Sequence, residues 1–165
     1  MMNTRKCLIT IIKYLLFFHI GGCLYYYIEI LYRGWSHWSM YVLGGICFLF
    51  ITLQRKHPFW SQSIVRQVLR CDFFVICGEF ITGCMVNLWL GWAVWDYIER
   101  PMNLMGQICL PLAFVFAGLC LTGIVLSELL EWLVFEEKKP FFIDALKRLA
   151  RISNSENHIE NSRKE

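Results

Sequence analysis

The chain has 165 residues, of which 57% are hydrophobic and 18% are charged, and its formal net charge is +3. Soluble proteins average about 45–50% apolar and about 25% charged residues, and one small soluble core cannot bury this excess. The apolar residues are also clustered in long runs, which suit lipid as a solvent. The composition therefore argues against an ordinary soluble domain and predicts an integral membrane protein with an all-α fold.

Four apolar stretches are long enough to cross a bilayer as helices. They cover residues 7–31, 38–53, 71–92 and 107–135, and together they predict a membrane domain over residues 1–140. The first stretch follows two basic residues, as a secretory signal would, but it is much longer than the signal's apolar core of about 7–15 residues. We therefore expect it to be a retained span and not a cleaved signal peptide.

Lysine and arginine are distributed unevenly among the connecting segments. The predicted loop at residues 54–70 carries four basic residues, whereas the other two loops carry only Arg33 and Arg100. More basic residues precede the first stretch and follow the fourth. Because basic residues are retained on the cytoplasmic side, the pattern predicts a multi-pass protein of the plasma membrane with both termini in the cytoplasm.

Two segments on the predicted inner side have apolar residues on one helical face and basic residues on the other. These segments are residues 61–70 and 141–152. We expect both to form interfacial helices on the inner leaflet, where basic side chains meet anionic lipid. The polar residues 153–165 are expected to be disordered. The predicted fold is thus a four-helix membrane bundle with two cytoplasmic amphipathic helices.

Polar residues within the third stretch form the clearest pattern. Four residues recur at every fourth position and so share one helical face, namely Glu79, Gly83, Asn87 and Gly91. The glycines would let another helix approach closely, which indicates a packing seam. Ionisable residues inside a span are costly and usually functional, so the alternative interpretation is that Glu79 and Asn87 line a solute or proton path.

Glu79 and Glu128 are predicted to lie at the same depth. Each would be about 10 Å from the cytoplasmic end of its span, at a helical rise of about 1.5 Å per residue. Two carboxylates that meet at one depth repel each other unless one is protonated or a cation lies between them. Lys13, at a similar depth, is one candidate for that cation. The alternative is that its amine extends to the inner surface.

His19 and Glu29 are further candidates for the path, on the first stretch. They are connected by three- and four-residue steps along one helical face. A single histidine in a span is more often a hydrogen-bonded packing residue than a ligand, and we interpret His19 in this way, with a place in the path as the alternative. Glu29 falls near the outer end, where it can pair with Arg33 one turn later.

The outer loops are aromatic and polar. In the second of them, Asp96 and Asn103 have two interpretations that stay open: turn chemistry within an aromatic belt, or a cap over the bundle. Several motifs are absent, namely G-x-x-x-x-G-K-[ST], H-E-x-x-H and G-x-S-x-G, and the eight cysteines have no metal-binding spacing. We therefore predict no enzymatic activity, no metal or cofactor and no nucleic-acid partner.

Several short runs carry a resemblance to a known family. They read E-F-I-T-G at 79–83, W-D-Y at 95–97, P-M-N-L at 101–104, G-Q-I-C-L at 106–110 and F-E-E-K-K-P at 135–140. Together they resemble the ABC transporter permease family called type IV, or CmpB-like, over residues 20–140. The resemblance implies a small multi-span protein of a transport system. It transfers no catalytic role to any residue.

The leading functional hypothesis is a permease-like transporter component of unknown solute. Such a component would require a separate ATPase subunit or self-association, because the chain has no P-loop, and a thin four-span bundle suggests a homo-oligomer. The alternative is a non-transporting scaffold or accessory subunit that binds partner helices and anionic lipid. An intramembrane enzyme has less support, because no nucleophile and base share a suitable spacing.

Overall fold

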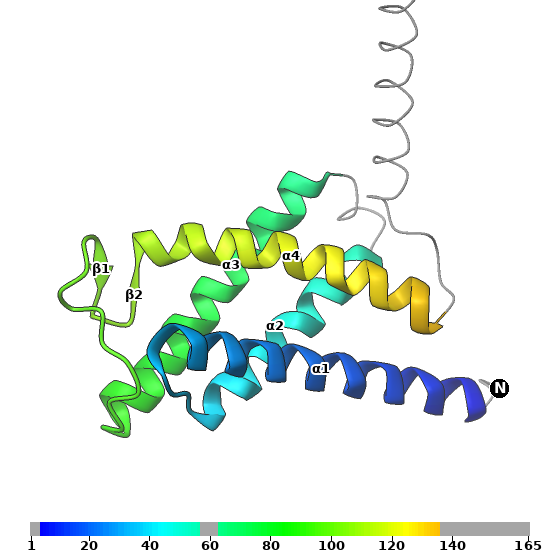
Figure 1. Cartoon of the computed structure of the whole chain (residues 1–165), viewed down its shortest axis with the longest axis horizontal. Coiled ribbons are helices and arrows are strands. Elements are labelled where there is room, and N and C mark those ends of the chain that lie inside the picture. Colours follow the sequence, from blue (N-terminus) through cyan, green and yellow to red (C-terminus); the bar gives the residue numbers. More distant parts are fainter. Residues whose placement is uncertain (1–3, 57–62, 136–165) are drawn as a thin grey trace, which may run out of the picture. The chain divides into compact units, whose positions relative to one another are not determined.

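The computed structural model describes residues 4–56 and 63–135 (Figure 1). The chain divides into two compact units, Met1–Ile124 and Val125–Glu165. The elements in chain order are α1 (Thr4–Arg33), α2 (Trp38–Lys56), α3 (Ile64–Gly83), the π-helix η1 (Cys84–Trp89), β1 (Asn103–Leu104), β2 (Ile108–Cys109) and α4 (Leu110–Phe135). The helix α4 belongs to the first unit up to Ile124.

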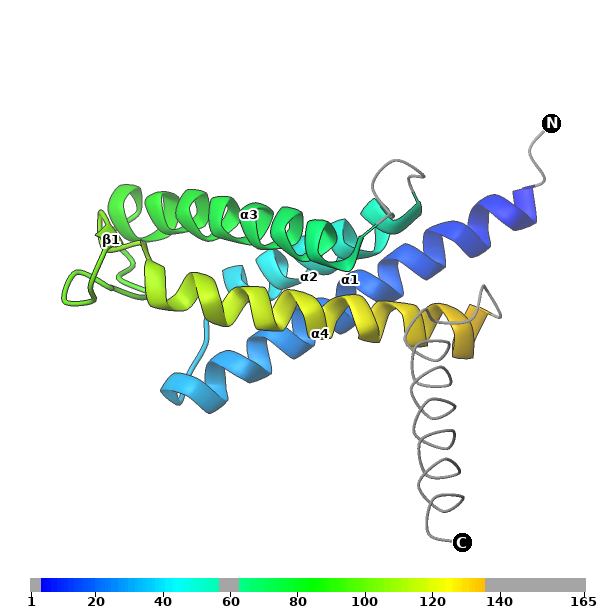
Figure 2. The same ribbon diagram turned by 90° about the horizontal axis from the view of Figure 1, so that it is seen from above.

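The predicted all-helical fold is confirmed. Four segments are long and apolar enough to cross a membrane, namely Cys7–Arg33, Trp38–Lys56, Ile64–Trp89 and Leu110–Phe135. The third of these combines α3 and η1, which Figure 2 shows running on from one another towards the β1–β2 loop. Within such helices every backbone N–H and C=O can be satisfied internally, as lipid requires.

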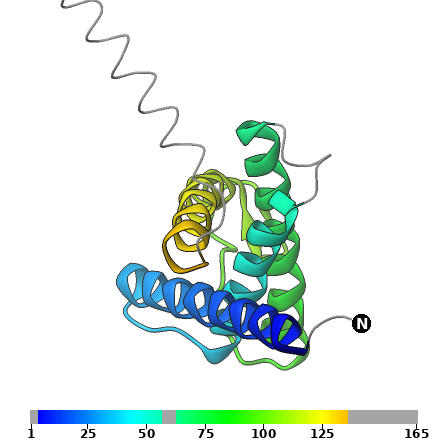
Figure 3. The same ribbon diagram turned by 90° about the vertical axis from the view of Figure 1, so that its right-hand side faces the viewer.

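The helices α1 and α2 pack closely through paired glycines. A Cβ atom added at Gly21 would lie 2.9 Å from the carbonyl oxygen of Gly44, and one added at Gly44 would lie 2.9 Å from the carbonyl oxygen of Gly21. Either distance is too short for a real Cβ, so the two backbones can approach only because both residues are glycine. The Phe17 and Phe48 rings stack beside this contact with centroids 5.7 Å apart. Figure 3 shows the two helices next to each other.

The third span ends in an unusual way. After Gly83 the backbone hydrogen bonds change from the α pattern, between residues four apart, to the π pattern, between residues five apart. One of them joins the Leu90 N–H to the Met85 carbonyl oxygen at 2.9 Å. Gly91 follows in the left-handed region, with φ +67°. A π-helix of this length is often found at functional sites. Here it ends the predicted span 71–92 at Trp89 and turns the chain into the loop before α4.

The structure differs from the prediction in two places, the first interfacial segment and the second outer loop. The segment 61–70 is not a separate helix: from Ile64 onward it forms the first turns of α3. The loop between η1 and α4 contains a small antiparallel ladder, in which Asn103 pairs with Cys109 and Leu104 with Ile108. The second predicted amphipathic helix and the tail that follows it lie outside the described residues.

Candidate functional site

A buried carboxylate connects α1 and α3. The side chain of Glu79 on α3 is only 2% exposed, and its Oε1 accepts a hydrogen bond from the Tyr25 hydroxyl on α1. A carboxylate removed from water is costly unless it is hydrogen-bonded. The Tyr25 hydroxyl supplies such a bond, so the pair fixes the two helices at this level.

The contact with Tyr25 places Glu79 beside the second half of α1. Because α3 begins at Ile64, Glu79 lies about 22 Å along the helix from that residue at a rise of about 1.5 Å per residue, and its depth in the membrane stays a prediction. Its partner on α1 is twelve residues beyond Lys13. Lys13 is itself buried, at 4% exposed, with its amine 5.7 Å from the centre of the Phe17 ring. Lys13 is therefore not the cation at the level of Glu79.

A second carboxylate lies nearer the end of α1. Glu29 forms an ion pair with Arg33 one turn later, as the spacing predicts, and its Oε2 also accepts a 3.2 Å hydrogen bond from the Ser36 hydroxyl. Arg33 donates from Nη1 to the Val94 carbonyl at 2.8 Å, and its guanidinium lies 4.8 Å from the centre of the Trp35 ring. The ion pair is largely buried and ties the end of α1 to the loop after η1.

A hydrogen bond between the side chains of Asn87 and Gln107 connects η1 with the turn between β1 and β2. The Asn87 amide donates to Gln107 Oε1 at 2.7 Å, and its Oδ1 accepts from the Val94 backbone N–H at 2.7 Å. The backbone carbonyl of Gln107 accepts from the Trp95 indole at 2.9 Å. Gln107 is 3% exposed. Both of these contacts of the Asn87 side chain are with the loop that follows η1, so Asn87 holds this loop in place.

The predicted glycine seam is only partly realised. A Cβ at Gly83 would lie 2.6 Å from Gln107 Oε1 and 3.0 Å from the Trp95 ring, so Gly83 makes room for the loop and not for another helix. Gly91 lies beyond the helix, and nothing is within 4 Å of where its Cβ would be. In the π-helix η1 the rotation per residue differs from that of an α-helix, so residues four apart no longer share one face. The regular stripe therefore ends before Gly91.

Asp96 and Asn103 shape the loop between η1 and α4, residues 90–109. Asp96 Oδ1 accepts from the Ile98 backbone N–H at 2.8 Å. The Asn103 amide donates to the carbonyls of Ile98 and Arg100, both at 2.9 Å, and its Oδ1 accepts from the Gly106 N–H at 3.1 Å. These contacts are the turn chemistry of the first interpretation. The two residues therefore organise the loop from which Tyr97 and Arg100 project.

The remaining candidates lie apart from this group or in the second unit. His19 is exposed on α1, with Nδ1 2.7 Å from the Tyr41 hydroxyl of α2 and Nε2 3.7 Å from the sulfur of Cys23. This agrees with the interpretation of His19 as a hydrogen-bonded packing residue. Glu128 lies on α4 in the second unit, and its relation to Glu79 stays a prediction.

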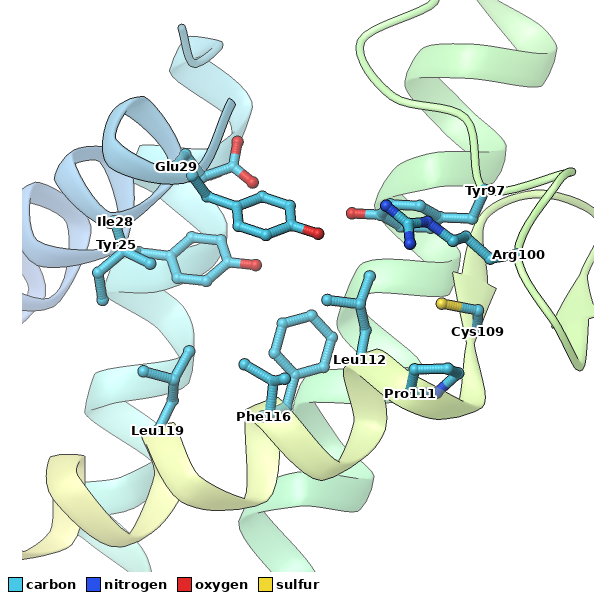
Figure 4. Close-up of a pocket in the computed structure, with 12 residues that line it drawn as sticks. Tyr25, Ile28, Glu29, Tyr97, Arg100, Cys109, Pro111, Leu112, Phe116 and Leu119 are labelled. Atoms are coloured by element: carbon cyan, nitrogen blue, oxygen red, sulfur yellow. The ribbon is translucent and has the colours of Figure 1, made fainter. Parts of the chain in front are cut away.

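A pocket of about 190 Å³ lies between α1, the loop that joins η1 to α4 and the start of α4 (Figure 4). Its polar lining consists of three tyrosines, a carboxylate, a guanidinium and a thiol: Tyr25, Tyr32, Tyr97, Glu29, Arg100 and Cys109. Its apolar lining comes mainly from α4, with Pro111, Leu112, Val115, Phe116 and Leu119, and from Ile28 of α1. The pocket is therefore amphipathic, with polar groups at the loop and apolar groups along α4.

Tyr97 contributes a protonated hydroxyl to this pocket. Burial raises the pKa of Tyr97 above its ordinary value of 10.0, and the nearby carboxylates of Glu79 and Glu29 raise the pKa further. The phenol is therefore neutral at physiological pH and keeps its hydrogen-bond donor. Figure 4 shows its hydroxyl directed across the pocket towards α1.

No metal centre is evident in the part of the chain that the structure describes. No group of three or more His, Cys, Asp or Glu side chains in residues 4–56 and 63–135 is arranged to hold a metal ion. The polar groups of the pocket are mostly hydroxyls with one guanidinium and one carboxylate. Such groups can bind and orient a small molecule by hydrogen bonds and charge.

Sequence reasoning found Glu79, Glu29 and Asn87 but missed their partners. Tyr25 and Gln107 are the two residues that complete the contacts of Glu79 and Asn87. Tyrosine is common in the first span, and nothing in the sequence distinguishes Tyr25 from its neighbours. The signal at Gln107 is a polar side chain just before a strongly apolar stretch, which can be read equally well as ordinary loop chemistry.

Four apolar helices and an amphipathic pocket define a multi-pass α-helical membrane protein. The family model described as "Putative ABC-transporter type IV" matches residues 16–144, which is most of the chain. The chain belongs to this family. No curated protein and no solved structure matches it.

Proposed function

We propose that the chain is the membrane-embedded, permease-like component of a transport system, with the amphipathic pocket as its solute site. One observation carries this proposal. The pocket is built from polar side chains at membrane-spanning helices, and behind its Tyr25 lies the buried carboxylate of Glu79. Such polar groups are costly in lipid and usually mark a function. The family assignment supports the same role.

In this proposal the pocket opens on the outer side of the plasma membrane. Arg33 ends α1 and Arg100 lies in the loop after η1, one arginine for each of these two connections. The connection between α2 and α3 is instead flanked by four basic residues, two in the last turn of α2 and two in the first turns of α3. Basic connections are retained in the cytoplasm. Both termini would then be cytoplasmic, and the pocket would receive a solute from outside or release one there.

Energy for transport would come from a separate ATPase subunit, because this sequence has no P-loop motif. Affinity purification from native membranes in mild detergent tests this point. We expect a subunit with the motif G-x-x-x-x-G-K-[ST] to be recovered with the tagged chain. Recovery of the chain alone, or only as a homo-oligomer, would contradict an ATPase-coupled permease.

The role of Glu79 is tested with the isosteric substitution Glu79→Gln in the purified complex reconstituted into vesicles. Glutamine keeps the volume and the hydrogen bond to Tyr25 but removes the charge. If Glu79 takes part in transport, ATP-dependent uptake should fall at least about tenfold, as for loss of a charged interaction, while insertion and assembly remain normal. Unchanged uptake would assign Glu79 a packing role.

The second candidate function is a non-transporting scaffold or accessory subunit. One observation favours it: the side chains of Asn87, Asp96 and Asn103 all form hydrogen bonds within the protein. Polar groups satisfied in this way stabilise a rigid framework. Under this alternative the chain would bind partner helices and anionic lipid, and Glu79→Gln would change assembly with its partners instead of uptake. We propose no enzymatic activity.

A further inference from the structure

The charge at the rim of the pocket is not balanced. Among the described residues, Glu29 is the only carboxylate that lines the pocket, and Arg33 and Ser36 both donate to its Oε2. Arg100 also lines the pocket, and in residues 4–56 and 63–135 its side chain forms no hydrogen bond or ion pair. The pocket therefore offers one uncompensated guanidinium at its polar end.

A second donor lines the same pocket. The Tyr97 hydroxyl has no hydrogen-bond partner within the described ranges, and Figure 4 shows that Tyr97 and Arg100 come from the same loop. The Tyr25 hydroxyl, by contrast, already donates to Glu79 and so presents only its lone pairs to the pocket. Tyr97 and Arg100 together provide O–H and N–H donors on the loop side of the pocket, which suit an oxyanion.

The apolar end of the pocket follows one face of α4. Leu112, Phe116 and Leu119 are spaced three or four residues apart, so they form a continuous strip along the helix. This strip runs away from Arg100 towards the middle of the span. Since a water occupies about 30 Å³ in the liquid, a pocket of about 190 Å³ has room for a chain of several methylene groups beside a small headgroup.

We propose that this pocket binds an anionic amphiphile, whose acidic headgroup is held by Arg100 and Tyr97 and whose apolar chain lies along Leu112, Phe116 and Leu119. The proposal names the ligand class for the solute site of the proposed function and rests on it. The headgroup chemistry is that of a carboxylate or phosphate. Its source is either the anionic phospholipid of the bilayer or a free fatty acid.

The main competing ligand is an organic cation. Three tyrosine rings and a carboxylate would suit a quaternary ammonium group. Two charges oppose this alternative, because Arg33 neutralises Glu29 and Arg100 would repel a cation at the rim. The two ligand classes can be compared on the unchanged protein with probes that share one chain and differ only in the headgroup.

The test uses the full chain in nanodiscs of zwitterionic phosphatidylcholine, with radiolabelled decanoate and decyltrimethylammonium as probes. We expect saturable decanoate binding, not displaced by decyltrimethylammonium. Equal or tighter binding of decyltrimethylammonium would overturn the proposal, and so would the absence of saturable decanoate binding. This comparison requires no variant, so it remains decisive even if a substitution in the loop prevents folding.

Variants then locate the binding site. Arg100→Gln should weaken decanoate binding about tenfold or more, since it removes a charge-assisted contact, and Tyr97→Phe should weaken it by a smaller factor. The matched control is Arg66→Gln, an exposed arginine near the start of α3, which should leave binding unchanged. Equal effects of Arg100→Gln and Arg66→Gln would contradict the assignment.

Two further arms separate the ligand source and the function. If phosphatidylglycerol in the nanodisc lowers decanoate binding in the wild-type chain but not in Arg100→Gln, the anionic lipid of the bilayer is a ligand. If phosphatidylglycerol does not compete with decanoate, a free fatty acid is favoured. Both results support the acidic headgroup. Binding without any ATP-dependent uptake would contradict the proposed function and leave the binding site intact, because the assay measures binding alone.

Discussion

The Tyr25 hydroxyl on α1 donates a hydrogen bond to the Glu79 carboxylate on α3, although the two residues are 54 positions apart in the sequence. Tyr25 also lines the pocket. One side chain thus connects the buried carboxylate with the candidate solute site, so a change at Glu79 can reach the pocket through Tyr25.

Removal of this hydrogen bond should destabilise the protein. In Tyr25→Phe the Glu79 carboxylate remains buried without the tyrosine donor, which should lower the free energy of unfolding by about 1–3 kcal/mol. The measurement is unfolding by titration with a denaturing detergent. The matched control is Tyr27→Phe on the same helix, because Tyr27 is 67% exposed. Equal losses in the two variants would show that the Tyr25–Glu79 bond contributes nothing.

The glycine contact between α1 and α2 should not tolerate a methyl group. A Cβ at Gly44 would meet the carbonyl oxygen of Gly21 and the side chain of Tyr25. Gly44→Ala should therefore lower the unfolding free energy by about 1–3 kcal/mol, the usual cost of overpacking. Gly118→Ala on α4 is the control, because nothing lies within 4 Å of its Cβ position. A stable Gly44→Ala variant would refute the close approach.

Loss of the hydrogen bonds of the Asn87 side chain should loosen the loop that follows η1. The Val94 N–H is bonded to Asn87 Oδ1 at 2.7 Å, so in Asn87→Ala this amide loses its partner. Hydrogen exchange of the peptide containing Val94 should accelerate about tenfold or more, as for the loss of a hydrogen bond to a buried group. Thr122→Ala, whose hydroxyl bonds only its own helix at Gly118, should leave that exchange rate unchanged.

High pH should destabilise the pocket through Tyr97. Its pKa in the folded protein is raised above 10.0 by burial, so the folded state disfavours the phenolate. The stability is complete below the ordinary pKa and is lost as the pH rises above it, where only the unfolded chain ionises freely. Between about pH 9 and about pH 11 the wild type should lose more stability than Tyr97→Phe. Identical pH profiles would contradict the burial of this phenol.

The spans were predictable because the signal is local. Each apolar run by itself is long enough to hide its backbone in lipid, and the buried polar residues Glu79, Glu29 and Asn87 stand out against such runs. The Glu29–Arg33 pair was equally accessible, since both residues lie on one helix one turn apart.

The contacts between elements were not predictable in the same way. The partner of Glu79 depends on how α1 packs on α3, and several tyrosines near the end of α1 satisfy the same pattern. The π-turn of η1 also changes the helical phase after Gly83, so regular spacing wrongly placed Gly91 in the seam. The closest glycine contact, between Gly21 and Gly44, requires two helices to be matched residue by residue.

The most direct measurement of the central claim is the sidedness of the two ends of the bundle. In the proposed topology the loop between η1 and α4 lies outside the cell and the connection between α2 and α3 lies in the cytoplasm. In intact cells a membrane-impermeant maleimide should label the variant Glu99→Cys, and it should label Arg66→Cys only after permeabilisation, each above the unsubstituted chain. If Arg66→Cys were labelled in intact cells and Glu99→Cys were not, the proposed topology would be contradicted.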